Sequence, residues 1–328
     1  ANSIKKIEVI TNPSAKYDPD GMAGIINIVT KKNKLEGFFG NVNLGAAYNG
    51  RYNVGGMLSI KQGKWNAMLN AGVSYRDQFS EGTTFRRNIG DTNTILDQVS
   101  DGNHVGFGGR VTMSLSYQIN QTASLSFATS QNLRAMERDQ VINYVNGFEN
   151  FNPFSVYGRT SETDFDMTFS NYRVDYDKNF KGKNHNLKAS FMLNQFDMNI
   201  TSGFIQGLNE VNPLDWSEIR QRNTTKADIP SYIGQIDYVK PLKKNNTLEL
   251  GAKTINKSGQ AFLAAEIYDS AAGTWVKEAL WSNDYQVDEG IHSAYAVYKQ
   301  NIKKFGYQVG LRLEKAFTDA FLLESGDT

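Results

Sequence analysis

Histidines and closely spaced carboxylates are the residues in this sequence whose chemistry could support metal binding or catalysis. The three histidines, His104, His185 and His292, are far apart in the chain. A structural zinc site needs four ligands brought together, and no further ligand stands at a metal-site spacing beside them. We therefore predict no metal site and interpret the histidines as solvated residues at strand ends or turns.

Asp175 and Asp177 are separated by one residue, so on a strand both carboxylates lie on the same face. Such a pair is a candidate for glycosidase-type acid and base catalysis. On a porin-type wall, however, that face is the polar interior, where charge is ordinary. Acidic stretches at 18–21 and 97–103 resemble calcium loops but lack the full ligand spacing of an EF-hand. We predict no catalytic residues, no cofactor and no enzymatic activity.

The composition of the 328 residues counts against nucleic-acid binding and helical membrane spans. Lys and Arg number 35 against 34 Asp and Glu, a net charge of +1, whereas nucleic-acid-binding proteins usually carry a basic excess. The absence of cysteine excludes a disulfide framework and a cysteine metal site. Mean hydropathy is −0.48, and no apolar run approaches the ~20 residues of a transmembrane helix. A transmembrane barrel fits these values because its strands alternate apolar and polar residues.

From Gly37 onward, apolar and polar residues alternate with the period of a β-strand. The clearest run is VGFGGRVTMSLSYQ at 105–118, whose odd positions are apolar or Gly and whose even positions, including Arg110, are polar or Gly. Between 163 and 180 the apolar phase changes, which predicts a β-bulge. The predicted strands exceed the ~5–6 residues of soluble strands and reach the ~9–11 of a tilted membrane strand. Further alternating runs lie at 38–48, 54–60, 67–75, 187–193, 232–238, 248–252 and 307–313.

Tight polar turns alternate with long segments along the chain. Barrel proteins of the outer membrane have short periplasmic turns and longer extracellular loops, so this alternation predicts an all-β, antiparallel transmembrane β-barrel. The turns lie at 62–64, 120–122, 181–184, 243–246 and 303–304, and the segments predicted to be long irregular loops lie at 78–103, 136–162, 202–224 and 265–284.

Aromatic residues gather beside the tight turns, where the girdle at a membrane interface is expected. The aromatic preference of strands in general is the simpler explanation, but the clustering recurs at several turns. We predict that these rings form an interfacial girdle: Trp65, Tyr117, Phe180, Tyr238, Tyr298, Phe305 and Tyr307.

A second group of aromatic residues occupies the predicted long loops, mixed with amide and acidic residues. Aromatic faces beside amides can stack on a sugar, a siderophore or a peptide. The alternative is that these rings pack the loops onto themselves. We predict ligand contact by the loop at 144–157, with both interpretations open, for this set: Tyr144, Phe148, Phe151, Phe154, Tyr157 and Trp216.

Counting strands between successive turns gives about eleven. Bacterial single-chain barrels use an even number of antiparallel strands, so an odd set predicts that further strands complete the barrel. The chain also begins without a signal peptide. We therefore expect a fragment that holds about half of a barrel wall and does not close or transport alone.

The first 34 residues differ from the rest, with short strand-like runs at 4–10 and 24–30 around a turn-rich stretch. Residues 7–32, IEVITNPSAKYDPDGMAGIINIVTKK, resemble the end of the plug domain in TonB-dependent outer-membrane receptors. Asn12, where that family usually has Gly, and the inserted 18–20 depart from the pattern. Together with GLRLE at 310–314, these features look like the outer-membrane β-barrel subfamily of Bacteroidetes-type bacteria. The matching residues are Ile7, Glu8, Val9, Pro13, Tyr17, Gly21, Gly24, Asn27 and Thr30.

The resemblance implies a barrel of about 22 strands, occluded by a plug and located in the bacterial outer membrane. It assigns residues 1–34 to the end of the plug and its linker, and 35–328 to the N-terminal half of the barrel. It further implies import of a scarce siderophore, glycan, peptide or similar ligand. The implied partners are the TonB energy-coupling complex, acting through parts that this chain lacks, the small ligand and outer-membrane lipid, with no nucleic acid.

Two other functions fit a barrel. One is a surface-binding or structural protein that does not transport, and the other is a passive porin. The plug-like segment counts against the porin, because an open pore gains nothing from a plug.

Overall fold

The computed structural model describes residues 4–10, 25–30, 36–90, 92–148, 153–182, 184–207, 218–242, 246–302 and 305–323. The strands are β1 (Ile4–Ile10), β2 (Ile25–Thr30), β3 (Gly37–Ala47), β4 (Arg51–Gln62), β5 (Trp65–Asn88), β6 (Thr94–Asn120), β7 (Ala123–Phe148), β8 (Pro153–Asn179), β9 (Asn186–Gln206), β10 (Ile219–Pro241), β11 (Asn246–Asp269), β12 (Thr274–Lys277), β13 (Asn283–Ile302) and β14 (Phe305–Leu322). A single 3-10 turn, η2 (Ala279–Trp281), precedes β13.

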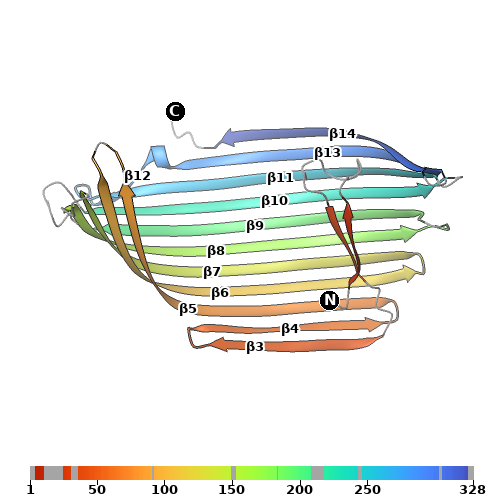
Figure 1. Ribbon diagram of the computed structural model, residues 1–328, viewed down its shortest axis with the longest axis horizontal. Coiled ribbons are helices and arrows are strands. Elements are labelled where there is room, and N and C mark those ends of the chain that lie inside the picture. The colour runs from red at the N-terminus through yellow and green to blue at the C-terminus, as the bar shows by residue number, and fades with distance from the viewer. Residues whose placement is uncertain are drawn as a thin grey trace.

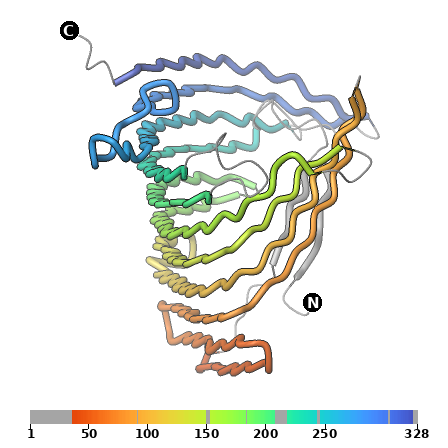
Figure 2. Tube along the Cα trace, turned by 90° about the vertical axis from the view of Figure 1, so that its left-hand side faces the viewer, coloured from red at the N-terminus to blue at the C-terminus, as the bar shows by residue number. Residues whose placement is uncertain are grey.

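The strands form two separate antiparallel sheets. β1 pairs with β2, and the other described strands form one sheet. Along its path, eleven strands pair with their neighbours in sequence order from β3 at one edge to β14 at the other, while the short β12 pairs with β11. Figure 1 shows these strands side by side, and Figure 2 shows the sheet curving like part of a barrel wall. The predicted all-β class and the count of about eleven antiparallel strands are confirmed.

No helix among the described residues is long and apolar enough to cross a membrane.

The tight turns use glycine where the backbone needs a positive φ. Gly63 (φ 54°) lies between β4 and β5, and Gly50 (φ 73°) between β3 and β4. A Cβ atom at Gly50 would lie 2.1 Å from the carbonyl oxygen of Asp77, whose amide donates to the Gly50 carbonyl at 2.9 Å. Only glycine fits there, so this turn is held against the neighbouring β5.

The ladder register divides the large sheet into two faces, because residues directly opposite each other on paired strands share a face. One face is apolar and exposed, as lipid contact requires, and we call it the belt face. Leu311 and Leu313 on this face are 65% and 68% exposed. The belt face can be followed from strand to strand because each of its residues is directly paired with the next. From β5 to β14 these residues are Trp65, Tyr117, Leu125, Tyr176, Ala189, Ile236, Ala252, Ala294 and Leu313.

The predicted aromatic girdle lies on the belt face, at the end of the sheet where the tight turns lie. Rings from neighbouring strands approach each other there, as residues at a shared membrane depth do. The ring centroids are separated by 4.5 Å for Trp65 and Tyr117, 6.2 Å for Phe180 and Tyr238, and 6.3 Å for Tyr298 and Tyr307.

Two of the predicted long irregular loops, 78–103 and 136–162, are wrong for most of their length, while residues 208–217 of the loop predicted at 202–224 lie outside the described residues. β5 continues to Asn88 and β6 begins at Thr94, so most of 78–103 is paired strand. In the same way β7 reaches Phe148 and β8 begins at Pro153. Turn-forming residues in these segments indicated loops, but the ladder extends through them because each hairpin pairs with the next. Figure 1 shows these extensions at the end opposite the tight turns.

The predicted bulge between 163 and 180 is also wrong. β8 pairs with both neighbours across this stretch without a shift of register. Instead, the apolar side changes face: Tyr172 lies on the belt face, whereas Phe165 lies on the opposite one. Acidic Asp164 occupies the belt face at that level, so the outer surface has passed from lipid to water and the apolar residues turn inward.

We call the face opposite the belt the lumen face. Its side chains crowd together, as expected on the inner side of a curved sheet: Val297, Asp237 and Tyr295 are 1%, 7% and 7% exposed. Tyr295 lies over Gly251, where a Cβ atom would approach its ring to 2.4 Å, and its hydroxyl donates a hydrogen bond to Asp237. This contact ties β13 to β10 across β11.

Candidate functional site

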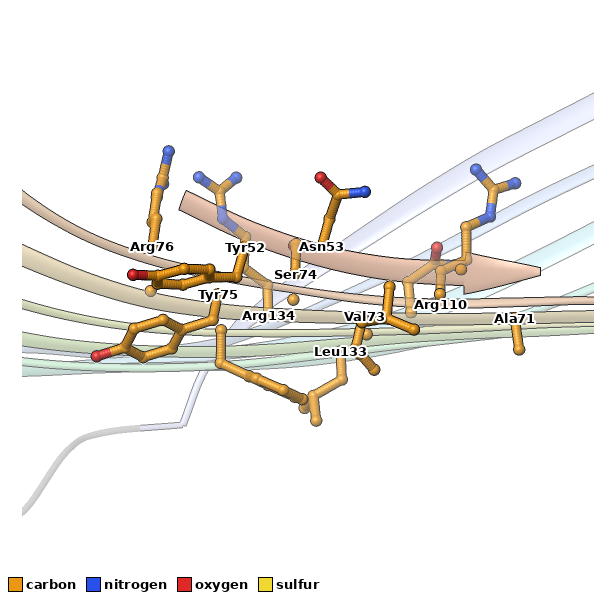
Figure 3. Close-up of a pocket in the computed structure, with 18 of the residues that line it drawn as sticks. Tyr52, Asn53, Ala71, Val73, Ser74, Tyr75, Arg76, Arg110, Leu133 and Arg134 are labelled. Carbon is orange, nitrogen blue, oxygen red and sulfur yellow. The ribbon is translucent and has the colours of Figure 1, made fainter. Parts of the chain in front are cut away.

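Four arginines from four neighbouring strands lie on the lumen face. Arg51 of β4 and Arg76 of β5 are directly opposite each other. Arg110 of β6 is opposite Gly72, and Arg134 of β7 is opposite Gly108. Figure 3 shows Arg76, Arg110 and Arg134 pointing to one side of the sheet, while Val73, Tyr75 and Leu133 point to the other.

The arginines surround a trough of about 1050 Å³ on this face. Glycines form much of its floor, since Gly55 and Gly72 are opposite each other and Gly106 and Gly108 follow on β6. At Gly106 a Cβ atom would lie 3.0 Å from the Arg76 Nε and 3.2 Å from its Cγ, so the arginine crosses β6 there. Neutral amides complete the lining: Asn41, Asn43, Asn53, Asn70 and Asn132.

Charge on β5, β6 and β7 is segregated between the faces. The basic residues of the trough occupy the lumen face, whereas the acidic residues of these strands all fall on the opposite face by register. β4 has no acidic residue. The acidic residues on the outer side are Asp77, Glu81, Asp97, Asp101, Glu137 and Asp139.

The partners of the trough arginines are neutral. Arg51 donates to the Gln78 side-chain oxygen at 3.1 Å, and Arg76 approaches the Met136 sulfur at 4.0 Å. The guanidinium carbon of Arg134 lies 6.0 Å from the centre of the Phe165 ring. Among the residues that the structure describes, none of the four guanidinium groups has a carboxylate partner.

Farther along the lumen face, from β8 to β14, five basic residues are paired with acidic ones, whereas Arg159 donates to the Gln206 side-chain oxygen at 2.5 Å. These pairs neutralise the wall locally, in contrast to the trough. Their nitrogen–oxygen distances are 2.7 Å for Arg173–Asp175, 3.8 Å for Lys188–Asp177, 3.0 Å for Lys257–Glu289, 2.5 Å for Lys299–Glu249 and 2.5 Å for Arg312–Glu314.

His104 is a titratable residue beside the trough. It lies opposite Arg138 on the lumen face, just beyond the apolar belt, and its Nε2 is 3.1 Å from the Ser80 hydroxyl. Burial, followed by the charges of Arg138 and Arg76, holds the pKa of His104 below its ordinary value. The local environment therefore disfavours additional positive charge.

Comparison with known families agrees with this architecture. Residues 178–328 match the model of the outer membrane protein beta-barrel family, a stretch that runs from the end of β8 through β14. This chain is an outer-membrane β-barrel protein. The barrel protein is located in the bacterial outer membrane, as its exposed apolar belt requires. A comparison with curated proteins finds no match.

The structure keeps the three histidines of the barrel protein apart. His104 lies on β6, His185 bonds to the Tyr238 hydroxyl at 2.9 Å, and His292 bonds to Thr254 at 2.8 Å. The part of the chain that the structure describes contains no group of three or more His, Cys, Asp or Glu residues that could hold a metal ion.

Asp175 and Asp177 share the lumen face, as predicted, and both have basic partners. The Arg173 guanidinium donates to both oxygens of Asp175, at 2.9 and 2.8 Å from Nε. Asp177 lies 3.8 Å from Lys188. The two carboxylates of the barrel protein are thus part of its neutralised wall.

The aromatic set predicted as a loop lies instead on paired strands. Tyr144 of β7 is opposite Tyr157 of β8, with the rings stacked at 4.7 Å, and Phe148 and Phe154 are 5.2 Å apart. The Arg159 guanidinium carbon lies 5.4 Å from the centre of the Tyr144 ring. These rings pack on one another because hairpin pairing extends to them, and contact with a ligand stays a prediction. Phe151 and Trp216 lie outside the described residues.

Part of the plug-like motif lies in the small sheet. Ile7, Glu8 and Val9 of β1 pair with Ile28, Asn27 and Ile26 of β2, and Thr30 ends β2. Pro13, Tyr17, Gly21 and Gly24 lie outside the described residues. The assignment of 1–34 to a plug end therefore stays a prediction.

The trough itself was missed by sequence analysis, although a signal existed. Arg110 was correctly placed on the polar face of its strand. Applying the same parity to β5 and β7 would have shown Arg76 and Arg134 on polar positions with every acidic residue on the other side. What the alternation could not supply is the register that brings them together.

Proposed function

We propose that the barrel protein is a receptor that imports a scarce ligand across the outer membrane by TonB-coupled active transport, and that it has no enzymatic role. The observation that carries this proposal is the position of the trough. Its arginines and amides line the lumen face, on the route that an imported solute follows, and not the outer surface.

A lumen site favours import over surface display. A barrel that displays loops to a partner needs its polar recognition residues at the tips, and its inner wall needs only to be neutral and packed. Five basic residues of the wall from β8 to β14 are neutralised in this way, whereas the four arginines of the trough have no acidic partner among the described residues. Moving a scarce ligand inward against its concentration gradient requires an energy source.

The resemblance of residues 7–32 to a plug end supports TonB as that source. In such receptors a plug closes the barrel, and pulling by TonB opens a path. The TonB complex and a small ligand are accordingly the proposed partners of this protein.

A genetic experiment tests the coupling without knowledge of the ligand. The gene is deleted in cells with and without a functional TonB complex, and growth is compared on media in which single nutrients limit growth. We expect deletion to slow growth on at least one limiting nutrient in TonB-competent cells and to add nothing in TonB-deficient cells. A defect that adds to the loss of TonB, or no defect on any medium, would contradict the proposal.

A further inference from the structure

We propose that the trough on the lumen face of β4–β7 binds a small polyanion, with Arg51, Arg76, Arg110 and Arg134 as its donors. This inference names the chemical class of the ligand for the proposed import function. It rests on that function only for the statement that the bound ligand is transported through the barrel. Carboxylate, phosphate and sulfate groups are all suited to guanidinium donors.

The first argument is that the arrangement costs stability without an internal reason. Arg51 and Arg76 are directly opposite each other, and like charges at such positions repel. The same wall shows that acids can be placed beside cations, since Arg173 and Arg312 each have one two residues away. A cationic cluster that lacks this neutralisation is suited to an external anion.

The second argument is donor capacity. A guanidinium carries five N–H donors. Arg51 uses a donor on Gln78, and Arg76 approaches a thioether, which is a weak acceptor. The Arg134 guanidinium carbon lies 6.0 Å from the centre of the Phe165 ring, which attracts a cation but is not a strong hydrogen-bond acceptor. Strong charge-assisted bonds are thus still available to a ligand.

The third argument is shape. The glycine floor keeps side chains off the backbone of the trough, and at Gly72 an added Cβ atom would meet only backbone atoms, at 3.5 and 3.7 Å. The four arginines come from four adjacent strands, which spreads them over three strand spacings, or ~14 Å. A single oxyanion cannot contact groups so far apart, so the matching ligand has several anionic groups. Asn53, Asn70 and Asn132 add neutral donors and acceptors for its hydroxyl or carbonyl groups.

The fourth argument is the field of the wall. The acidic residues of β5–β7 lie on the outer side, whereas the arginines of the trough lie on the inner side. A concave surface lined by one sign of charge concentrates counter-ions and speeds their association. Burial is the main cause of the lowered pKa of His104, and the charges of Arg138 and Arg76 lower it further.

Binding to the purified full-length protein in detergent tests this inference. The probes are inositol hexakisphosphate, citrate and uncharged inositol, measured by titration calorimetry. We expect both polyanions to bind, inositol not to bind, and affinity to fall at least tenfold as NaCl is raised from about 50 to about 500 mM. The stronger of the two polyanions identifies phosphate or carboxylate as the preferred group.

Substitutions of arginines in and outside the trough test where the polyanion binds. Arg76→Gln with Arg110→Gln should weaken polyanion binding at least tenfold, whereas Arg312→Gln, the same change at a paired arginine of the lumen face, should leave it within twofold. Should the double variant fold poorly, Arg76→Lys with Arg110→Lys keeps the charges, and it should weaken binding by less. Equal losses in the trough and in Arg312→Gln, or equal binding of inositol, would overturn the inference.

The import proposal and the polyanion-binding inference can be refuted by different results. Loss of TonB dependence with polyanion binding intact would refute the import proposal alone. Absence of polyanion binding by a protein whose deletion still shows TonB-dependent growth would refute the inference alone.

Discussion

The lumen faces of β4–β7 and of β8–β14 are built from the same antiparallel ladder but differ in how their charges are partnered. In the second region five basic residues, Arg173, Lys188, Lys257, Lys299 and Arg312, have acidic partners, and buried polar contacts such as Tyr295 to Asp237 tie strands together. In the first, arginines face one another across a glycine floor. The difference indicates that one region is arranged for stability and the other for a ligand. Substitutions in the two regions should therefore differ in size and in sign.

The largest effect should come from Tyr295 in the paired region. Tyr295→Ala removes a buried ring that covers Gly251 and leaves the Asp237 carboxylate without its hydroxyl donor. We expect a loss of about 3–5 kcal/mol, from the cavity and the lost hydrogen bond together. The measurement is the unfolding free energy in detergent. A loss below about 1 kcal/mol would show that this contact does not secure the wall.

A smaller loss is expected when one ion pair is broken. Glu249 is 12% exposed at its side chain and lies 2.5 Å from Lys299, which is 36% exposed. Glu249→Gln leaves a half-buried cation with a weaker acceptor, which should cost about 1–2 kcal/mol. The double change Glu249→Gln with Lys299→Gln should recover part of the loss. A double variant no more stable than the single one would contradict this assignment.

The trough should respond with the opposite sign. Arg51→Gln removes a repulsion with Arg76 and breaks no ion pair, so the free protein should be unchanged or more stable by up to ~0.5 kcal/mol. The measurement is the thermal unfolding of Arg51→Gln compared with that of Arg312→Gln, which does break an ion pair. Destabilisation of the Arg51 variant by as much as the Arg312 variant would mean that the trough is also structural.

The smallest effect concerns pH. Because the pKa of His104 lies below its ordinary value, the unfolded chain binds more protons than the folded protein between those two values, and stability falls as pH is lowered through that window. A polyanion bound near Arg76 and Arg138 would favour the protonated form of His104. Phosphate groups of a ligand also titrate near this window, so the measurement is the ratio of wild-type affinity to that of His104→Gln. This ratio should rise about twofold as pH falls through the window, and a ratio that does not change with pH would contradict the role of His104.

Much of the architecture could be predicted from sequence because it depends on local patterns. The period of two in runs such as 105–118 gave the strands and the belt face, and the turns gave their order. The extended hairpins were missed because turn-forming residues such as those near Asp101 also occur within long paired strands. Residues 144–157 were interpreted as a loop for the same reason, although Tyr144 and Tyr157 stack across a ladder.

The trough could be predicted only in part. Local alternation placed Arg110 on a polar face, but its neighbours Arg51, Arg76 and Arg134 come from other strands. Their proximity depends on the register of three hairpins, which the pairing of whole strands sets. The absence of acid beside them is likewise a property of a face and not of any one segment.

Electron cryo-microscopy of the full-length protein with inositol hexakisphosphate tests the central claim most directly. We predict ligand density over the glycine floor, within hydrogen-bonding distance of Arg76 and Arg110. Density against the paired wall of β8–β14, or a carboxylate of the protein itself seated between these arginines, would contradict the assignment of the trough to an anionic ligand.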